Sequence, residues 1–221
     1  MPDIYRISEI FHSIQGEGPS AGAPAVFVRL QGCDVGCAWC DSRYTWPAEG
    51  GAPLGLDAVL GRATASGAAE LLVITGGEPL EHQGIAALLE QAARRWPRVE
   101  IETSGILPPP LSLAPLHWNV SPKLPSATPR WEATWAHTPA WIAEPRAVFK
   151  IVAGSDADAA EALRLIDAHG LPRARVMLMP EGLTDARVRE GALRLAPICR
   201  REGLRLSPRL HVWMWGAKRG V

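Results

Sequence analysis

The sequence has no surplus of either charge and no long apolar run. Lys plus Arg and Asp plus Glu both number 23, so we expect no positive field that would gather nucleic acid or an acidic membrane surface. No apolar stretch approaches the roughly 20 residues that cross a bilayer, and the first residues lack the basic start and apolar run of a signal peptide. These absences favour a cytoplasmic protein that acts on a small molecule, without nucleic-acid or membrane partners.

Cysteine is also scarce, and three of the four cysteines stand close together in GCDVGCAWCDS as Cys33, Cys37 and Cys40. Cys199 lies in a helical stretch and is expected to be a small buried hydrophobe. Clustered cysteines in the cytoplasm bind metal more often than each other. Four thiolates saturate a 4Fe–4S cluster, whereas three leave one iron open, as a catalytic centre requires. A zinc site completed by a histidine is the alternative, although the nearest downstream histidine is His82.

Strand-length apolar runs alternate with helical patterns along the chain. The runs lie at 25–31, 70–75, 98–103, 116–121, 147–152 and 174–179. One helical pattern aligns apolar residues from Ile85 to Trp96, and another opens at the candidate N-cap Asp156 and closes at Gly170. This order predicts an α/β fold with a parallel sheet, either open or a partial TIM-like barrel, in one domain over 1–221.

Residues 108–146 break the alternation with nine prolines and four tryptophans. Proline at this density argues against a long helix. A disordered linker would leave Trp131, Trp135 and Trp141 in water, so we expect a folded insertion or a subunit contact here.

Polar motifs follow the predicted strands directly, where ligands of such folds bind. The spacing C-x3-C-x2-C, with Trp39 before the last cysteine, resembles the cluster loop of the radical S-adenosylmethionine superfamily. TGGEP, from Thr75 to Pro79, resembles that superfamily's second motif, in which backbone at the glycines approaches the cofactor. The resemblance implies a 4Fe–4S cluster on Cys33, Cys37 and Cys40, with S-adenosylmethionine on the open iron.

Within that superfamily the chain is similar to the 7-carboxy-7-deazaguanine synthases. The similarity runs from residue 8 to residue 221 apart from the Pro/Trp-rich region, and the segments that carry it are IFHSIQGEGPSAGAPAVFVRLQGC, CDS, ETSG, SPK and LHVWMWGAKRGV. It implies a shortened TIM-like barrel, usually a homodimer, that contracts the ring of 6-carboxy-5,6,7,8-tetrahydropterin and releases ammonia in queuosine or other deazapurine biosynthesis. It also implies Mg²⁺ and an electron donor such as flavodoxin or ferredoxin.

Two alternatives to a synthase stay open. A glycyl-radical-enzyme activase shares the cysteines and GGEP, although IQGEGP and WGAKRGV argue against it. A non-enzymatic iron–sulfur or zinc module is the second alternative.

The resemblance also assigns individual residues. Those assigned to the pterin are Ile14, Gln15, Gly16, Glu17, Arg29, Thr75, Glu102, His211 and Val221. Those assigned to S-adenosylmethionine are Trp39, Cys40, Asp41, Gly77, Ser121, Pro122, Lys123, Met179, Pro180, Glu181 and Gly182. Ser42 is assigned to Mg²⁺, which commonly keeps its waters and takes substrate oxygens as further ligands. Carboxylate and amide oxygens suit the donor edge of a pterin, and a guanidinium suits its carboxylate.

Overall fold

The computed structural model describes residues 4–216 and 218–221. Within these residues the strands form one nine-stranded sheet in the order β3-β1-β2-β4-β5-β6-β7-β8-β9. The strands are β1 (Ile4–Ile14), β2 (Pro24–Leu30), β3 (Ala52–Gly55), β4 (Leu71–Gly76), β5 (Arg98–Thr103), β6 (Leu116–Val120), β7 (Ala147–Ala153), β8 (Val176–Pro180) and β9 (Arg205–Leu206). The helices are α1 (Leu56–Ser66), α2 (Ile85–Arg95), α3 (Thr138–Ala143), α4 (Asp156–Ala168), α5 (Asp185–Glu202) and α6 (Leu210–Trp215).

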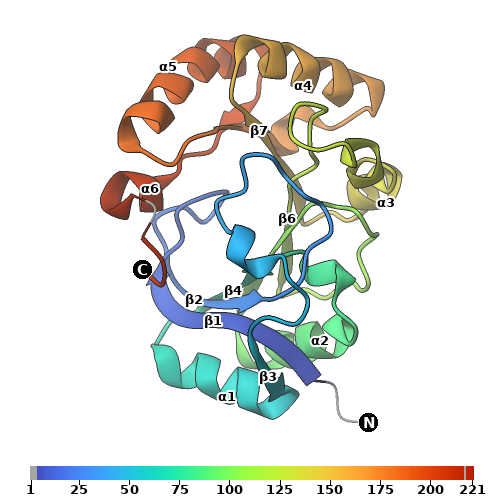
Figure 1. Ribbon diagram of the computed structural model, residues 1–221. Helices are drawn as coiled ribbons and strands as arrows, with labels where there is room; N and C mark the ends of the chain where they lie inside the picture. The colour runs from blue at the N-terminus through green and yellow to red at the C-terminus, as the bar shows by residue number, and fades with distance from the viewer. Residues whose placement is uncertain (1–3, 217) are drawn as a thin grey trace.

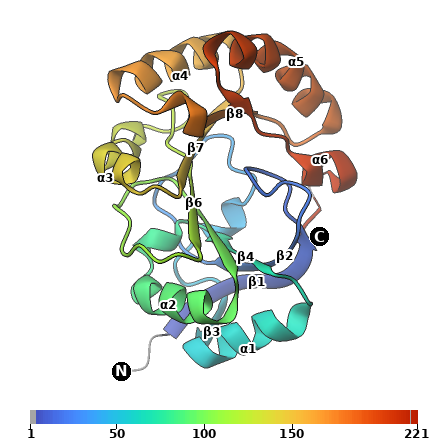
Figure 2. The same cartoon turned by 180° about the vertical axis from the view of Figure 1, so that it is seen from behind.

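The sheet is a partial barrel. From β2 to β9 neighbouring strands are parallel, and only β1 pairs antiparallel, with β2 on one side and β3 on the other. The order ends at β3 and β9 without a pairing between them, so the sheet is not closed. Figures 1 and 2 show that the sheet is curved, with α1, α2, α4 and α5 on its outer side. The predicted fold class is therefore confirmed.

All six predicted parallel strands are present, with ends shifted by two residues at most. The predicted helical cap at Asp156 was wrong by one position. Ser155 is the N-cap residue of α4, because its extended backbone lets the side chain accept from the N–H of Asp158. Asp156 instead occupies the first turn, where its charge favours the positive end of the helix dipole. Gly170, with φ of +64°, follows the helix end as expected.

Most of the Pro/Trp-rich region packs onto the chain's own core. It supplies β6 near the middle of the sheet, and it also contains α3. Trp135 and Trp141 are 2% and 1% exposed, and Trp141 meets Trp118 edge to face at 5.2 Å. Trp135 and Trp141 are thus folded into the protomer, which was the first of the two expectations, a folded segment or a subunit contact. Their apolar surface is not left for a partner subunit.

The loop between β1 and β2 bridges the open side of the barrel to the C-terminal segment. Gly18 N donates to Ser207 Oγ and Leu210 N donates to Gly16 O, both at 2.9 Å. A Cβ at Gly16 would lie 2.1 Å from His211 Nδ1, so only glycine allows this approach. The bridge brings residues from both ends of the sequence to one pocket. Among the helices of the described ranges, none combines the length and the apolar character that a membrane crossing requires.

Candidate active site

Two adjoining pockets lie at the C-terminal ends of the parallel strands. The first, here called the tail pocket, is lined by the β1–β2 loop, the ends of β2 and β4, and the C-terminal tail (residues 216 and 218–221). The second, here called the cysteine pocket, is lined by the three clustered cysteines and the ends of β4 to β8. The residues that line both pockets are Glu17, Asp41, Ser42, Thr75, Gly76 and Glu102.

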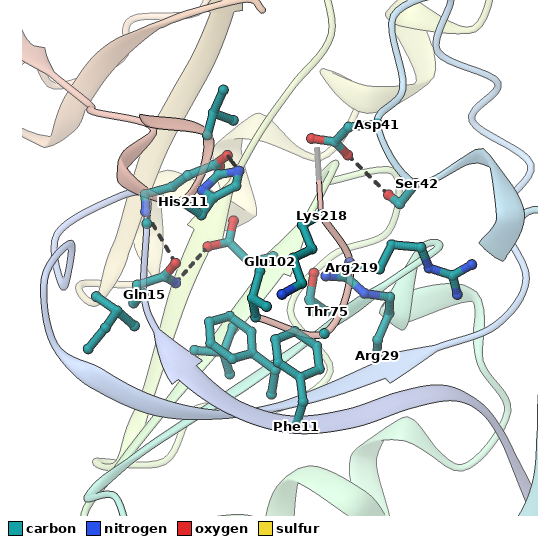
Figure 3. Close-up of a pocket in the computed structure, with 18 of the residues that line it drawn as sticks. Phe11, Gln15, Arg29, Asp41, Ser42, Thr75, Glu102, His211, Lys218 and Arg219 are labelled. Atoms are coloured by element: carbon teal, nitrogen blue, oxygen red, sulfur yellow. Dashed lines mark hydrogen bonds and ion pairs between the residues drawn. The ribbon is translucent and has the colours of Figure 1, made fainter. Parts of the chain in front are cut away.

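The predicted substrate residues meet in one place. All nine of them line the tail pocket, and Figure 3 shows Gln15, Glu102 and His211 on one side of it, opposite Arg29. Eight of the eleven predicted cofactor residues line the cysteine pocket, namely Trp39, Cys40, Asp41, Gly77, Ser121, Lys123, Met179 and Glu181.

Three predicted cofactor residues, Pro122, Pro180 and Gly182, do not line the cysteine pocket. Pro180 faces the outer side of the sheet, because successive residues of a strand point to opposite faces. There a Cβ added to Gly191 on α5 would come within 2.7 Å of Pro180 Cβ. The carbonyl of Gly182 is already bonded to the Arg209 guanidinium. Met179 and Glu181 are therefore the members of MPEG that face the pocket.

The cysteine pocket offers three soft ligands and no obvious fourth. Cys33, Cys37 and Cys40 are all free thiols, and no histidine is among the residues that line the pocket. Burial raises the pKa of Cys33 to about 11 and also raises that of Cys37. Cys199 is buried on α5, away from this pocket, with Sγ 3.5 Å from Arg205 O. Three thiols without a histidine suit a cluster with one open iron better than a tetrahedral zinc site.

The GGEP turn is packed against the cluster loop. Gly77 N donates to Leu30 O at 3.1 Å, and a Cβ on Gly77 would lie only 1.9 Å from Gly32 O. The carboxylate of Glu78 accepts from Thr103 Oγ1 at 2.6 Å and from Ser104 N at 2.7 Å. Glu78 thus ties the turn after β4 to the end of β5, and its oxygens are occupied by protein donors.

A row of alternating charges runs between the two pockets. Lys150 Nζ on β7 lies 2.7 Å from Glu102 Oε2 and 2.6 Å from Glu17 Oε2. Arg209 then joins Glu17, at 3.0 Å from Oε1, to Asp41. Lys150 and Arg209 were not predicted as site residues. A lysine inside the apolar strand AVFKIVA was the signal that could have found the first of them.

The charged row gives its members different protonation behaviour. Although burial favours the neutral acid, Lys150 and Arg209 hold the pKa of Glu17 well below its usual range. At Glu102, burial and the negative charge of Glu17 both raise the pKa of the carboxyl group. Together they exceed the lowering effect of Lys150, so the pKa of Glu102 is raised. Burial lowers the pKa of His211, so its imidazole is neutral near pH 7. The pocket therefore presents one firmly ionised carboxylate and one neutral imidazole to a ligand.

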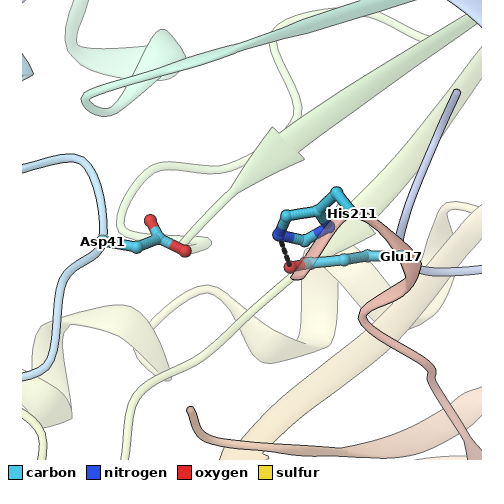
Figure 4. Close-up of side chains that lie close together, drawn as sticks. All are labelled: Glu17, Asp41 and His211. Atoms are coloured by element: carbon cyan, nitrogen blue, oxygen red, sulfur yellow. Dashed lines mark ion pairs between the residues drawn. The ribbon is translucent and has the colours of Figure 1, made fainter. Parts of the chain in front are cut away.

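Glu17, Asp41 and His211 also have the composition of a cation site. Their donor atoms lie within 4.8 Å of one another, and Figure 4 shows Glu17 and His211 side by side with Asp41 opposite. The Arg209 guanidinium, however, bonds to both carboxylates. It supplies the positive charge that a metal ion would otherwise bring, so we assign this group to the charged row.

The tail pocket has an aromatic wall and an unpaired donor. Phe11 and Phe27 stack with ring centroids 4.9 Å apart and planes 4° from parallel. Arg29 Nε is buried and has no hydrogen-bond partner among the described residues, while the guanidinium lies 5.8 Å from the Phe11 centroid. A flat apolar surface beside an unsatisfied cation suits a planar ring that carries a carboxylate. Neither phenylalanine was predicted as a site residue. Phe27 lies in the predicted strand 25–31, but the segment that carries Phe11 was not recognised as its neighbouring strand.

The C-terminal tail is anchored to β1 and to the Tyr44 ring, at the edge of this pocket. Arg219 Nη2 lies 2.8 Å from Glu9 Oε1 on β1, and its guanidinium lies 3.5 Å from the centroid of the Tyr44 ring. Figure 1 shows the C-terminus beside β1. Lys218 and Val221 line the pocket on either side of this anchor.

Comparison with known proteins agrees with this geometry. The family model described as the radical SAM superfamily matches residues 27–194, so the chain belongs to the radical SAM superfamily. It is 39% identical to the 7-carboxy-7-deazaguanine synthase of Pyrobaculum aerophilum, with 97% of this chain and 96% of that protein covered. It is 37% identical to the enzyme of the same name from Chlorobaculum tepidum, covering 98% and 97%. Within the superfamily, the chain belongs to the 7-carboxy-7-deazaguanine synthases.

Solved structures agree. The crystal structure of QueE from Escherichia coli superposes with a TM-score of 0.67 at 27% identity, covering 92% of this chain and 93% of that one. SuiB of Streptococcus suis bound to S-adenosylmethionine, at 13% identity and a TM-score of 0.51, shares the fold alone.

Proposed function

We propose that this protein converts 6-carboxy-5,6,7,8-tetrahydropterin to 7-carboxy-7-deazaguanine, with release of ammonia, in queuosine or other deazapurine biosynthesis. The observation that carries the proposal is the tail pocket. It gathers all nine residues expected to bind the pterin, and it shares a wall with the pocket that contains the three cysteines.

The residues of the chain bind and orient the reactants. When bound, the cluster supplies one electron that cleaves S-adenosylmethionine and thereby starts hydrogen abstraction from the substrate. Arg29 gains a partner for its buried Nε when it pairs with the pterin carboxylate. Glu17 and Glu102 accept from the donor edge of the ring, and the phenylalanine wall holds its plane. Lys123, which donates to Ser121 Oγ at 3.0 Å and lies 5.6 Å from the Trp39 ring, lines the cofactor side.

An anaerobic assay tests this function directly. Reconstituted protein is incubated with S-adenosylmethionine, a reductant and 6-carboxytetrahydropterin, and the products are analysed by ultraviolet absorbance and mass. We expect a product with the mass of 7-carboxy-7-deazaguanine and stoichiometric ammonia, both absent without S-adenosylmethionine. Cleavage of S-adenosylmethionine without any deazapurine would contradict the proposed substrate.

Ser42 is the proposed protein ligand of Mg²⁺. It precedes the short helix Arg43–Thr45 as its N-cap residue, yet its hydroxyl makes no capping bond and the residue lines both pockets. We expect Ser42→Ala to raise the Mg²⁺ concentration for half-maximal turnover by roughly tenfold or more, with a smaller effect on S-adenosylmethionine binding. Ser126→Ala, which removes an exposed hydroxyl bonded to Asp158, is the matched control. An unchanged Mg²⁺ titration would remove Ser42 from the site.

Deletion of residues 216–221 tests the tail. We expect it to raise the KM for the pterin by about tenfold or more, the effect of one or two lost polar contacts, because the tail forms one wall of the pocket. Iron content and S-adenosylmethionine cleavage without pterin should change little, since no tail residue lines the cysteine pocket. Arg219→Met keeps the tail but removes its anchor to Glu9 and Tyr44 together with one guanidinium from the pocket lining, and should give a smaller rise. A truncated enzyme with wild-type KM would contradict a substrate-binding tail.

Several broader features belong to the same proposal. The chain acts as a single radical SAM domain over 1–221, and the region 108–146, expected as an insertion, is part of that domain through β6 and α3. It works in the cytoplasm, as a homodimer that takes electrons from a flavodoxin or ferredoxin. Sedimentation equilibrium of the wild type tests the dimer, and a monomer at micromolar concentration would contradict it. Reduction of the loaded enzyme by purified flavodoxin, compared with ferredoxin, tests the donor.

A further inference from the structure

The loop from Cys33 to Cys40, here called the cluster loop, is hydrogen-bonded by a segment that belongs to none of the motifs described above. Residues 127–130, here called the brace segment, lie directly after the SPK motif and the turn that follows it. Three hydrogen bonds join the two, all to the backbone of the loop between the first and third cysteines. Ala38 N donates to Ala127 O at 2.7 Å, Thr128 Oγ1 donates to Val35 O at 2.6 Å, and Arg130 Nη1 donates to Asp34 O at 2.6 Å.

The contact at Thr128 is shielded from water. Thr128 is 3% exposed and Val35 is 2% exposed. Val35 also packs with Ile106 and Ala133, in the apolar group that contains the three cysteines. Loss of the Thr128 hydroxyl would leave the Val35 carbonyl buried without this donor, which costs more than the loss of a surface hydrogen bond.

The loop is also held by Glu81, which follows the GGEP turn. Asp34 N donates to Glu81 Oε2 at 3.2 Å, and Glu78 N in the GGEP turn donates to Gly32 O at 2.9 Å. The backbone from Gly32 to Ala38 is therefore held both by the turn after β4 and by the brace segment. Because the three thiols lie on this one loop, its backbone conformation sets the distances between them.

We propose that the brace segment positions the cluster loop, with Thr128 as a positioning residue that keeps the three cysteines arranged for the 4Fe–4S cluster. The inference rests on the cluster assigned under the proposed function, but not on the identity of the substrate. It gives part of the Pro/Trp-rich region a role at the site. Without the hydroxyl of Thr128 the loop opens more often, and an open loop releases iron.

The chain contains a matched control. Thr138 is also buried, at 4% exposed, lies in the same region, and donates a 2.6 Å hydrogen bond to a backbone carbonyl. Its acceptor is Trp135 O, within its own segment, and not the cluster loop. Thr128→Val and Thr138→Val therefore make the same chemical change at two buried sites that differ in their acceptor.

Iron release distinguishes the two variants. Each reconstituted protein is mixed anaerobically with an Fe²⁺ chelator, iron loss is followed by absorbance, and the reduced cluster is examined by EPR spectroscopy. We expect Thr128→Val to lose iron about tenfold faster than wild type, the factor for one buried hydrogen bond of about 1.4 kcal/mol, and to show an altered EPR signal. Thr138→Val should match wild type in both, and Thr128→Ser, which keeps the hydroxyl, should restore slow release.

Thermal unfolding of the apo proteins separates local from global effects. We expect the two valine variants to have similar melting temperatures, because each loses one buried hydrogen bond to a backbone carbonyl. Thr128→Val also loses the partly buried 3.2 Å bond that its hydroxyl accepts from Arg130 N, within the brace segment itself. Equal rates of iron loss from both would overturn the proposal, as would fast loss from Thr128→Ser. A protein that forms no deazapurine, yet loses iron selectively in Thr128→Val, would contradict the proposed substrate and leave the brace intact.

Discussion

Lys150→Met is expected to lower the free energy of unfolding by about 3–5 kcal/mol, the usual cost of removing one partner from a buried ion pair. Lys150 is 3% exposed, and its ammonium lies within 2.7 Å of both Glu17 and Glu102. Methionine fills a similar volume but leaves Glu102 without its cation and Glu17 with Arg209 alone. Urea unfolding of the apo protein measures the change.

Arg98→Met is the matched control for Lys150→Met. Arg98 pairs at 2.8 Å with Glu100, another buried carboxylate on β5, and lines neither pocket. We expect a smaller loss of stability, because the guanidinium is partly exposed and Glu100 also accepts from Ser20 and Asn119. Only Lys150→Met should raise the KM for the pterin. Equal effects of both variants on KM would contradict the role of the charged row in substrate binding.

Lys150→Met should also change how activity and stability depend on pH. Removal of the cation disfavours both carboxylates in their charged form, so the pKa values of Glu17 and Glu102 rise and the acid limb of kcat/KM moves to higher pH. In the wild type, the depressed pKa of Glu17 contributes stability that is fully present above the unfolded value of about 4.3 and is lost as pH falls through the folded value. Unfolding measured between about pH 5 and 3 should therefore show a weaker pH dependence in Lys150→Met.

Cys33→Ala, Cys37→Ala and Cys40→Ala are each expected to abolish the cluster and reduce S-adenosylmethionine cleavage to the level of the apo protein. With only three thiolates in the pocket, the loss of one leaves two irons without a protein ligand. Iron and sulfide analysis after anaerobic reconstitution measures the effect. Cys199→Ala is the control, since this thiol is buried on α5 and should cost stability without affecting iron content. If Cys199→Ala loses the cluster as well, the argument for an open iron fails.

Six of the seven parallel strands could be predicted because each is an apolar run that the fold largely buries, whereas the two-residue β9 is exposed and has no such signal. The residues after them could then be placed in one site, since parallel strands end at the same edge. The orientation of single residues was harder to predict. The family resemblance assigned Pro180 to the pocket with the rest of MPEG, but alternation along β8 turns Pro180 outward and leaves Met179 and Glu181 inward.

Interactions between distant segments could not be predicted from the sequence. The role of Lys150 depends on Glu17 and Glu102, which are 133 and 48 residues away along the chain. Nothing in the local pattern of β7 indicates those partners. Phe11 and Phe27 became neighbours through the antiparallel pairing of β1 with β2, which the search for parallel strands did not include. The brace at Thr128 likewise depends on a contact 93 residues away.

The bridge across the open side of the barrel also has a consequence for how the protein is made. Gly18 meets Ser207, and Glu17 meets Arg209, so these contacts join residues 189 and 192 positions apart. A ribosome that adds about 5–20 residues per second needs roughly 10–40 s to cover that distance. The three cysteines are translated early in this interval, long before Arg209 and His211 exist. Each nascent chain therefore carries its metal-binding thiols during most of its synthesis without a complete pocket around them, because that pocket includes Arg209.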